Sequence, residues 1–405
     1  MRVRCAVATG LGVAAPNGLG TQNYWSATLR SVTGIRPISR FDATVYPVKL
    51  AGEVRGFEPA EHLPSRLIPQ TDRMTRLALA AAAWALADAG VDAGSLPEYD
   101  TGVVTASSCG GFEFGQRELE NLWGRAPAHV SAYQSFAWFY AVNTGQISIR
   151  HGIRGPSGVL VTDDAGGLDA VGHARRLIRN GTSLVVSGGA DSSLCPWGLV
   201  AQLPCGMLST GQEPDSGYLP FDERAGGYVP GEGAAIVVLE DADAARRRGA
   251  RCYGEIAGYA ATFDPRPGSG RPSGLRRAIE LALADADVTP SEVDVVFADA
   301  AGVRELDTAE ANAINSVFGP YGVPVTAPKT MTGRLHAAGA ALDLAAALLA
   351  ITNGIIPPTV NVRPAPEHQL NLVTGTPLRA RLRTALLIAR GYSGFNAAML
   401  VRGVA

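Results

Sequence analysis

Two stretches of the sequence are apolar around almost the whole circumference of a helix, and they constrain the fold more than any other feature. They cover residues 77–86 and 338–351 and are rich in alanine and leucine. A helix at the surface of a globular domain normally has one apolar stripe and one polar face. A helix without a polar face has to be covered on more than one side. The sequence therefore predicts a layered fold in which these two helices lie between layers.

Short apolar runs alternate with helical segments along the whole chain. In the first part we expect helices at 76–89, 112–123 and 165–180, and strands at 3–8, 100–106, 158–162, 183–187 and 234–239. The second part repeats the pattern, with helices at 275–286, 308–318 and 338–352 and strands at 293–298, 385–389 and 397–401. This alternation predicts an α/β fold with a mostly covered sheet. A charged stretch at 241–249 separates two halves, 1–250 and 251–405.

The composition limits the classes of function. Only 18% of the 405 residues are charged, against about 25% in typical domains, so much of the surface must be hidden in internal layers or against a partner. The 35 basic and 37 acidic residues argue against a nucleic-acid partner. No apolar run reaches the ~18 residues of a membrane span. The five scattered cysteines form no CxxC pair, which favours a reduced, cytoplasmic protein without a disulfide framework or metal site.

The glycine-rich segments do not have the patterns of cofactor loops. Gly10-Leu-Gly12 continues into Val-Ala-Ala-Pro, which lacks the later glycine of a dinucleotide fingerprint. The glycines at 226–233 precede a strand, whereas a phosphate loop precedes a helix. We therefore expect no cofactor.

Several long motifs resemble one enzyme family. They are YLPFDERAGGYVPGEG at 218–233, PKTMTGR at 328–334 and GYSGFN at 391–396. These segments resemble the β-ketoacyl-ACP synthase branch of the thiolase fold, over essentially the whole chain. Segments 135–152 and 297–307 are similar to the chain-length factor, or ketosynthase β, of bacterial type II polyketide synthases. The resemblance implies a thiolase-like, five-layer αβαβα fold with two pseudo-symmetric halves.

The resemblance also implies that the condensing site has been lost. Active members use a Cys nucleophile, two His and a Lys; Asp164 stands at the Cys position, and Asp299 and Arg334 stand at the His positions. Only Lys329 matches. Other members of the subgroup have Gln at the Cys position, so Asp164 puts in doubt any role that needs a neutral amide.

Two roles remain open for this altered site. A carboxylate suits a helix N-terminus, so Asp164 is expected to act as a structural cap. We also expect Lys329 and Arg334 to pair with Asp164, Asp299 or Glu310 in a buried salt network. The alternative is that Asp164 assists the decarboxylation of a malonyl group.

The family resemblance further implies a tunnel for the growing chain at a subunit interface. Phe112, Gly115 and Leu119 are spaced three and four residues apart, so they share one helix face and are candidates for the tunnel end. The missing side chain at Gly115 predicts a longer tunnel, suited to a chain of nine to ten units. The alternative is an ordinary core face in which glycine allows close helix packing.

Aromatic residues are concentrated in a short segment that the resemblance places at the subunit contact. They are Tyr133, Phe136, Trp138, Phe139 and Tyr140. Aromatic side chains anchor protein interfaces, so we expect this segment to contact a partner; an internal core is the alternative.

Three functions are compatible with the sequence. The first is a non-condensing subunit that pairs with a ketosynthase α subunit, acts on chains carried by an acyl carrier protein and sets polyketide length. The second is a malonyl-ACP decarboxylase that supplies the primer. The third is a structural homodimer or binding module.

Overall fold

The structure, a computed structural model, describes residues 4–92, 95–266 and 268–404. One half of its main sheet comes from the N-terminal part of the chain. Its strands, in spatial order, are β1 (Ala6–Ala15), β8 (Gly233–Asp241), β7 (Leu184–Asp191), β5 (Thr101–Ala106) and β6 (Ser157–Leu160). The first two neighbouring pairs are antiparallel and the next two are parallel. The first residue of the strand expected at 3–8 lies outside the described residues.

The C-terminal part of the chain repeats the same pairing order. Its strands are β9 (Gly254–Phe263), β16 (Phe395–Arg402), β15 (Thr384–Arg390), β10 (Val295–Phe297) and β11 (Pro324–Thr326), with β13 (Asn371–Leu372) beyond them. Again two antiparallel pairs are followed by parallel ones. The two halves join where β1 pairs with β9. The expected α/β fold with two pseudo-symmetric halves is confirmed.

Alternate side chains of β8 show how the layers are stacked. Ile236 and Val238 pack in one core with α3 (Arg73–Asp88), whereas Val237 and Leu239 pack in another with α7 (Gly166–Arg179) and α12 (Ala337–Asn353). Since successive side chains of a strand point to opposite faces, α3 and α12 lie on opposite sides of the sheet.

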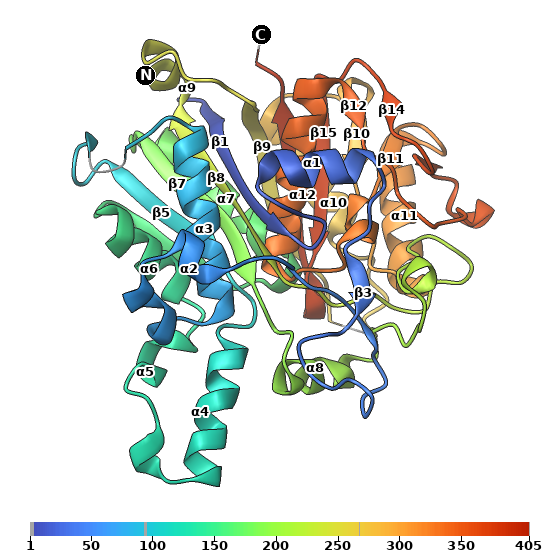
Figure 1. Cartoon of the computed structure of the whole chain (residues 1–405). Coiled ribbons are helices and arrows are strands. Elements are labelled where there is room, and N and C mark those ends of the chain that lie inside the picture. Colours follow the sequence, from blue (N-terminus) through green and yellow to red (C-terminus); the bar gives the residue numbers. More distant parts are fainter. Residues whose placement is uncertain (1–3, 93–94, 267, 405) are drawn as a thin grey trace.

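The C-terminal half of the sheet is covered on its other face by two more helices. These are α10 (Leu275–Ala286) and α11 (Arg304–Phe318), which pack in a third core. Figure 1 shows α3 beside β7 and β8, with α10 and α11 on the far side of α12. The five-layer αβαβα order is thereby confirmed.

The two all-apolar helices are buried in different ways. Helix α12 lies between the two halves of the sheet, as expected. Helix α3 belongs to an outer layer, and its second side is covered by α6 (Val142–His151) and by the segment that carries Phe57 and Leu63. Its apolarity therefore reflects a covering of helix and loop rather than a second sheet.

Glycines within strands account for the main differences in strand length. The sequence pattern ends the first strand before Gly10 and Gly12, but β1 continues to Ala15. Helix α3 packs so closely on β1 at these two glycines that a Cβ at either position would collide with carbonyl groups of α3. Likewise β7 continues through Gly188 and Gly189, whose backbones touch β8 and the start of α12. These glycines permit close approach rather than a turn.

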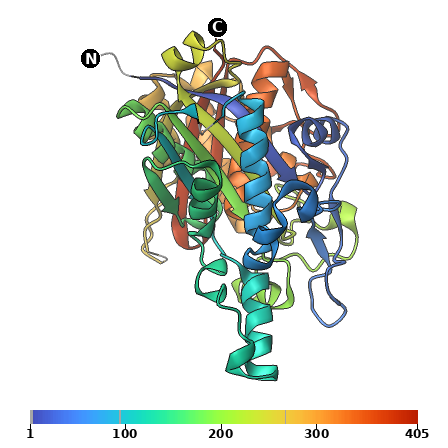
Figure 2. The same ribbon diagram turned by 60° about the vertical axis from the view of Figure 1, so that its left-hand side comes forward.

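One helix leaves the layered body. Helix α4 (Phe112–Gly124) extends away from the sheet, on the side opposite the chain ends, and the chain returns through α5 (Gln134–Ala137). Both views show this projection (Figures 1 and 2). Among the described residues, no helix has the length and apolar character needed to cross a bilayer.

Candidate functional site

The turn between β6 and α7 places two carboxylates at the centre of the molecule. Asp163 has a φ of 54°, a left-handed conformation that makes the turn tight. Asp164 follows it in a short 3-10 turn, Asp163–Ala165, that leads into α7 at Gly166. The expected cap is wrong, however, because no side-chain bond caps the N-terminus of α7.

The Asp164 carboxylate instead faces Arg334. The guanidinium donates to Asp164 Oδ2 at 2.9 Å, and to the two carboxylate oxygens of Asp299 at 3.1 Å each. It also donates to the Arg390 carbonyl at 3.1 Å, and its side chain is only 6% exposed. The three residues predicted to stand at the Cys and His positions thus form one closed ion triad, which contains the pairs expected for Arg334.

The two carboxylates of this triad differ in their electrostatics. Burial opposes ionisation of Asp299, but the Arg334 and Lys329 cations together lower its pKa below the usual value. At Asp164 burial outweighs the attraction of Arg334 and raises the pKa. Burial also disfavours the Arg334 cation, but the two carboxylates raise its pKa well above normal. Arg334 is therefore charged and neutralised on both sides.

Lys329 has a different partner from those expected. Its ammonium lies 2.7 Å from Asp343 on α12 and donates to the Asp299 carbonyl at 3.0 Å. Asp343 is the only charged residue in α12. A single carboxylate in an otherwise apolar helix is the sequence signal from which this pair could have been predicted. Glu310 makes no ion pair with Lys329 or Arg334; it accepts the backbone N–H groups of Asp299 and Ala300 at 2.6 and 2.8 Å.

His336 also belongs to this site, although no sequence motif marks it. It is 7% exposed and has a φ of 50°, an uncommon conformation for a non-glycine residue. Its Nδ1 lies 3.9 Å from Asp163 and its Nε2 lies 3.2 Å from the Ser193 hydroxyl. Burial disfavours the imidazolium, but Cys109 and Asp163 raise the pKa of His336 well above its usual value.

Cys109 lies beside His336, yet the pair is not an activated nucleophile. Burial raises the pKa of the Cys109 thiol more than His336 lowers it. A thiol attacks only as the thiolate, and the raised pKa disfavours that form of Cys109. Asp163, Asp164 and His336 lie close enough to share a metal ion.

Two cavities open on either side of the triad. One of about 210 Å³ is lined by Asp164, Asp299, Arg334 and Tyr392. A second, of about 370 Å³, is lined by Asp164, Cys109, His336 and Phe112. Asp164 borders both cavities.

The structure brings two of the three tunnel candidates together against a residue that the sequence did not indicate. The Phe112 ring packs on Trp197 of α8 (Pro196–Gln202), with ring centroids 4.7 Å apart. A Cβ added at Gly115 would lie 2.8 Å from the Trp197 ring. The space that glycine leaves is thus filled by an indole. Leu119 lies one turn further out and is 38% exposed.

The aromatic segment lies at the surface of this chain. Tyr133, Trp138, Phe139 and Tyr140 are exposed, and Phe136 is half-buried. The exposed rings contact one another in sequence, with Trp138 against Phe139 and Phe139 against Tyr140. In the chain this segment comes after α4 and the short turn at Pro127–His129.

Comparison with known proteins identifies the class. The β-ketoacyl synthase N-terminal domain family matches residues 5–245, and the C-terminal domain family matches residues 253–363. The chain therefore belongs to the β-ketoacyl synthase family.

Its close relatives narrow the class further. The chain is 62% identical to the tetracenomycin polyketide synthase ketoacyl synthase beta subunit of Streptomyces glaucescens, over 98% of both chains. It is 61% identical to the actinorhodin polyketide putative beta-ketoacyl synthase 2 of Streptomyces coelicolor, over 97% of both. The ishigamide ketosynthase/chain length factor superposes with a TM-score of 0.90 at 30% identity and full coverage of both chains. The predicted resemblance to ketosynthase β subunits is confirmed.

Proposed function

We propose that this chain is the non-condensing β subunit, or chain-length factor, of a type II polyketide synthase. The observation that carries the proposal is the closed Asp164–Arg334–Asp299 triad at the positions where the family has its nucleophile and histidines. Condensation needs a thiolate that accepts an acyl group and donors that stabilise an oxyanion. A carboxylate held by a guanidinium is a poor acyl acceptor, because the resulting anhydride is far more labile than a thioester. The ionised Asp299 would also repel the developing charge.

The missing chemistry must then come from a partner, a ketosynthase α subunit that carries the Cys and both His. The relatives support this assembly: one solved complex of 26% identity holds a type II acyl-carrier protein with its ketosynthase bound to the hexaketide. In this chain β6 is the last strand of the sheet order, and the edge of such a strand is a ready site for pairing. The exposed aromatic side chains at 133–140 supply apolar anchors near α5.

We infer that Phe112, Gly115 and Leu119 close the end of a shared tunnel, with a product of nine to ten units. Phe112 borders the larger cavity. The Trp197 indole beside Gly115 is 41% exposed, so it has solvent-side space into which it can turn. A long product requires that movement. We also propose the division into halves 1–250 and 251–405, and a cytoplasmic location in line with the free thiols Cys109 and Cys252.

Reconstitution tests the proposal. The chain is co-expressed with a ketosynthase α subunit and supplied with acyl carrier protein and malonyl donor, and product length is measured by mass spectrometry. Gly115→Trp should shorten the main product by at least one two-carbon unit. Gly124→Trp is the matched control, because it places the same ring at the end of the same helix in open space. An unchanged product with Gly115→Trp would remove the tunnel assignment, and failure to co-purify would count against the partner.

A malonyl-ACP decarboxylase is the second candidate, favoured by the cavity of about 210 Å³ beside Asp164 and Arg334. A malonyl carboxylate would have to displace one of the two carboxylates that already hold Arg334. Radiolabelled malonyl-ACP decides the question: release of labelled CO₂ by the isolated chain, lost in Asp164→Ala, would establish the decarboxylase. If the chain forms a stable homodimer and does not bind the α subunit, that result would instead support a structural module.

A further inference from the structure

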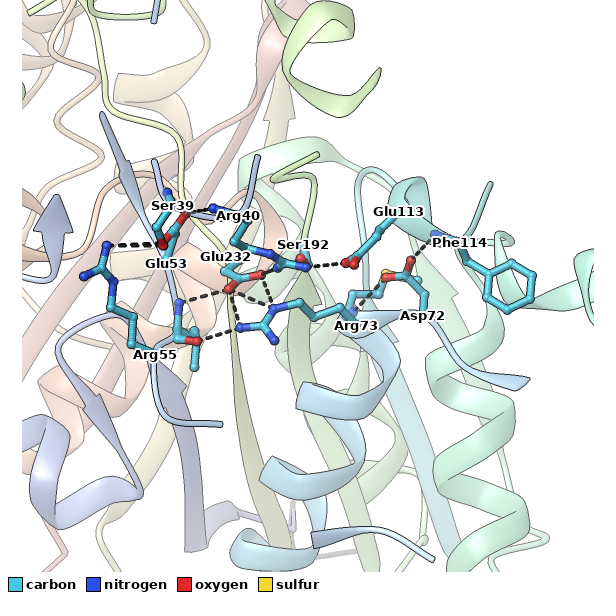
Figure 3. Close-up of polar contacts among 12 residues, drawn as sticks. Ser39, Arg40, Glu53, Arg55, Asp72, Arg73, Glu113, Phe114, Ser192 and Glu232 are labelled. Carbon is cyan, nitrogen blue, oxygen red and sulfur yellow. Dashed lines mark hydrogen bonds and ion pairs between the residues drawn. The ribbon is translucent and has the colours of Figure 1, made fainter. Parts of the chain in front are cut away.

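The first turn of α4 is capped by a carboxylate from another helix. Asp72 is the N-cap of α3, where its Oδ1 accepts the Met74 N–H at 2.8 Å. Its Oδ2 accepts the Phe114 N–H of α4, also at 2.8 Å. The N-cap of α4 itself is Gly111, which has no side chain to offer. One carboxylate therefore satisfies the orphan N–H groups of two helices (Figure 3).

Water cannot replace this bond without a rearrangement of the chain. Asp72 is 1% exposed. A Cβ added at Gly111 would lie 2.9 Å from the Asp72 Cβ, so the two helix starts touch. The contact needs glycine at this position, and it fixes the start of α4 against the start of α3.

A series of ion pairs also holds the first turn of α4 in place. Glu113 lies 2.5 Å from Arg40, whose other nitrogen lies 2.8 Å from Glu232. The guanidinium of Arg73 on α3 donates to both carboxylate oxygens of Glu232, at 2.7 and 2.8 Å. Glu232 is completely buried in the loop before β8 and also accepts from Ser192 at 2.6 Å. Figure 3 shows the resulting line of charges from the core to Glu113.

These bonds lie directly beside Phe112, which borders the larger of the two cavities, and Gly115, which faces the Trp197 ring. The bonds are made by Glu113 and Phe114, which lie in the chain between Phe112 and Gly115. Helix α4 packs mainly on α5, α8 and the short turn at Pro127–His129, and it extends away from the sheet. The polar bonds at its first turn therefore set where Phe112 meets Trp197.

We propose that Asp72 is a positioning residue which, with the Glu113–Arg40–Glu232 line, fixes the depth of the tunnel end and so the length of the product. This inference rests on the proposed function of α4. Asp72 does not touch the chain; it acts through the backbone of α4.

The charge state of Asp72 gives the proposal a second readout. Burial raises the pKa of Asp72 to about 7, and the Glu113 carboxylate adds to the rise while the two N–H donors and Arg76 oppose it. Arg40 and the Cys195 thiol also face it. The ionised carboxylate accepts at both oxygens, whereas the protonated form accepts well at only one. We therefore expect the product distribution to broaden as the pH falls below about 7.

The test compares three variants in the reconstituted complex. Asp72→Asn keeps one acceptor oxygen, so one of the two N–H bonds is lost; the product distribution should broaden by at least one two-carbon unit and lose its pH dependence. Glu113→Gln, at the half-exposed end of the line, is the milder variant if Asp72→Asn does not fold. Asp307→Asn is the matched control, because Asp307 of α11 is also buried and accepts one backbone N–H group on each oxygen, from Phe221 and Gly302.

The outcomes separate the two proposals. If Gly115→Trp shortens the product while Asp72→Asn and Glu113→Gln leave it unchanged, Asp72 is not a positioning residue and the proposed function stands. If Asp307→Asn broadens the product to the same degree, the effect is general destabilisation and the inference is wrong. If neither Gly115→Trp nor Asp72→Asn changes the product, the role of α4 fails and this inference fails with it.

Discussion

Removal of Arg334 tests whether the site is a structural ion triad. In Arg334→Met the side chain keeps most of its apolar stem but loses the guanidinium. Asp164 and Asp299 then face each other in a buried site without their shared cation. Breaking a buried ion pair by removing one partner costs about 3–5 kcal/mol. We expect a loss of that size in the free energy of unfolding.

The pH dependence gives the test its sign. With Arg334 present the folded pKa of Asp299 is lowered, so its stabilising contribution is present above its unfolded pKa and disappears as the pH falls through the folded value. Without Arg334, burial raises the pKa values of the two carboxylates. At a pH above those values both are ionised in a buried site, which destabilises the folded state. At lower pH they are protonated and this destabilisation disappears. The difference between the wild type and Arg334→Met should therefore be largest near neutral to alkaline pH and shrink towards acid pH.

Urea unfolding at a fixed protein concentration measures both effects, at about pH 8 and about pH 5.5. Arg246→Met is the matched control, because Arg246 pairs with Asp243 at the surface with 76% and 47% of the two side chains exposed. Such pairs contribute about 0–1 kcal/mol. A loss below about 1 kcal/mol for Arg334→Met at the higher pH, or an equal loss at both pH values, would refute the reasoning.

Three further outcomes follow from the same contacts. Asp164→Cys should yield no condensation by the isolated chain with acyl- and malonyl-ACP, since both histidine positions remain substituted; a condensed product would contradict this. Lys329→Met should lower stability by about 3–5 kcal/mol, because it leaves Asp343 buried without its cation, and adding Asp343→Leu should recover much of the loss in urea unfolding. Burial raises the pKa of Asp307 to about 7 and that of Glu310 to about 8. The folded state then holds these protons more tightly than the unfolded state, so stability should fall between about pH 5 and 8, and Asp307→Asn should flatten that slope.

The site illustrates where reasoning from sequence succeeds. Asp164, Asp299 and Arg334 were located from motifs of the family, and the structure brings them together. Charges in such apolar surroundings have to pair, and the Arg334 guanidinium lies between the two carboxylates. The prediction that Arg334 pairs with them followed from that requirement alone.

The failures at the site have a common cause. Asp343, His336 and Trp197 each meet their partner through packing between separate elements, and for His336 and Trp197 those elements are far apart in the chain. Trp197 reaches Gly115 because α8 packs on α4, and no periodicity within either helix encodes that approach. His336 reads as an isolated residue until the chain reversal at the start of α12 places it beside Asp163 and Cys109.

The sequence by itself determined the class of fold, because apolar period and strand–helix alternation are local properties. It also predicts the loss of the nucleophile, because that prediction needs only the residue identities at the motif positions. Tertiary structure alone decided which charges share the buried site, what fills the space beside Gly115 and how α4 is fastened through Asp72. Those outcomes depend on the distances between separate elements, which are set by how the layers pack. Local sequence carries no measure of those distances.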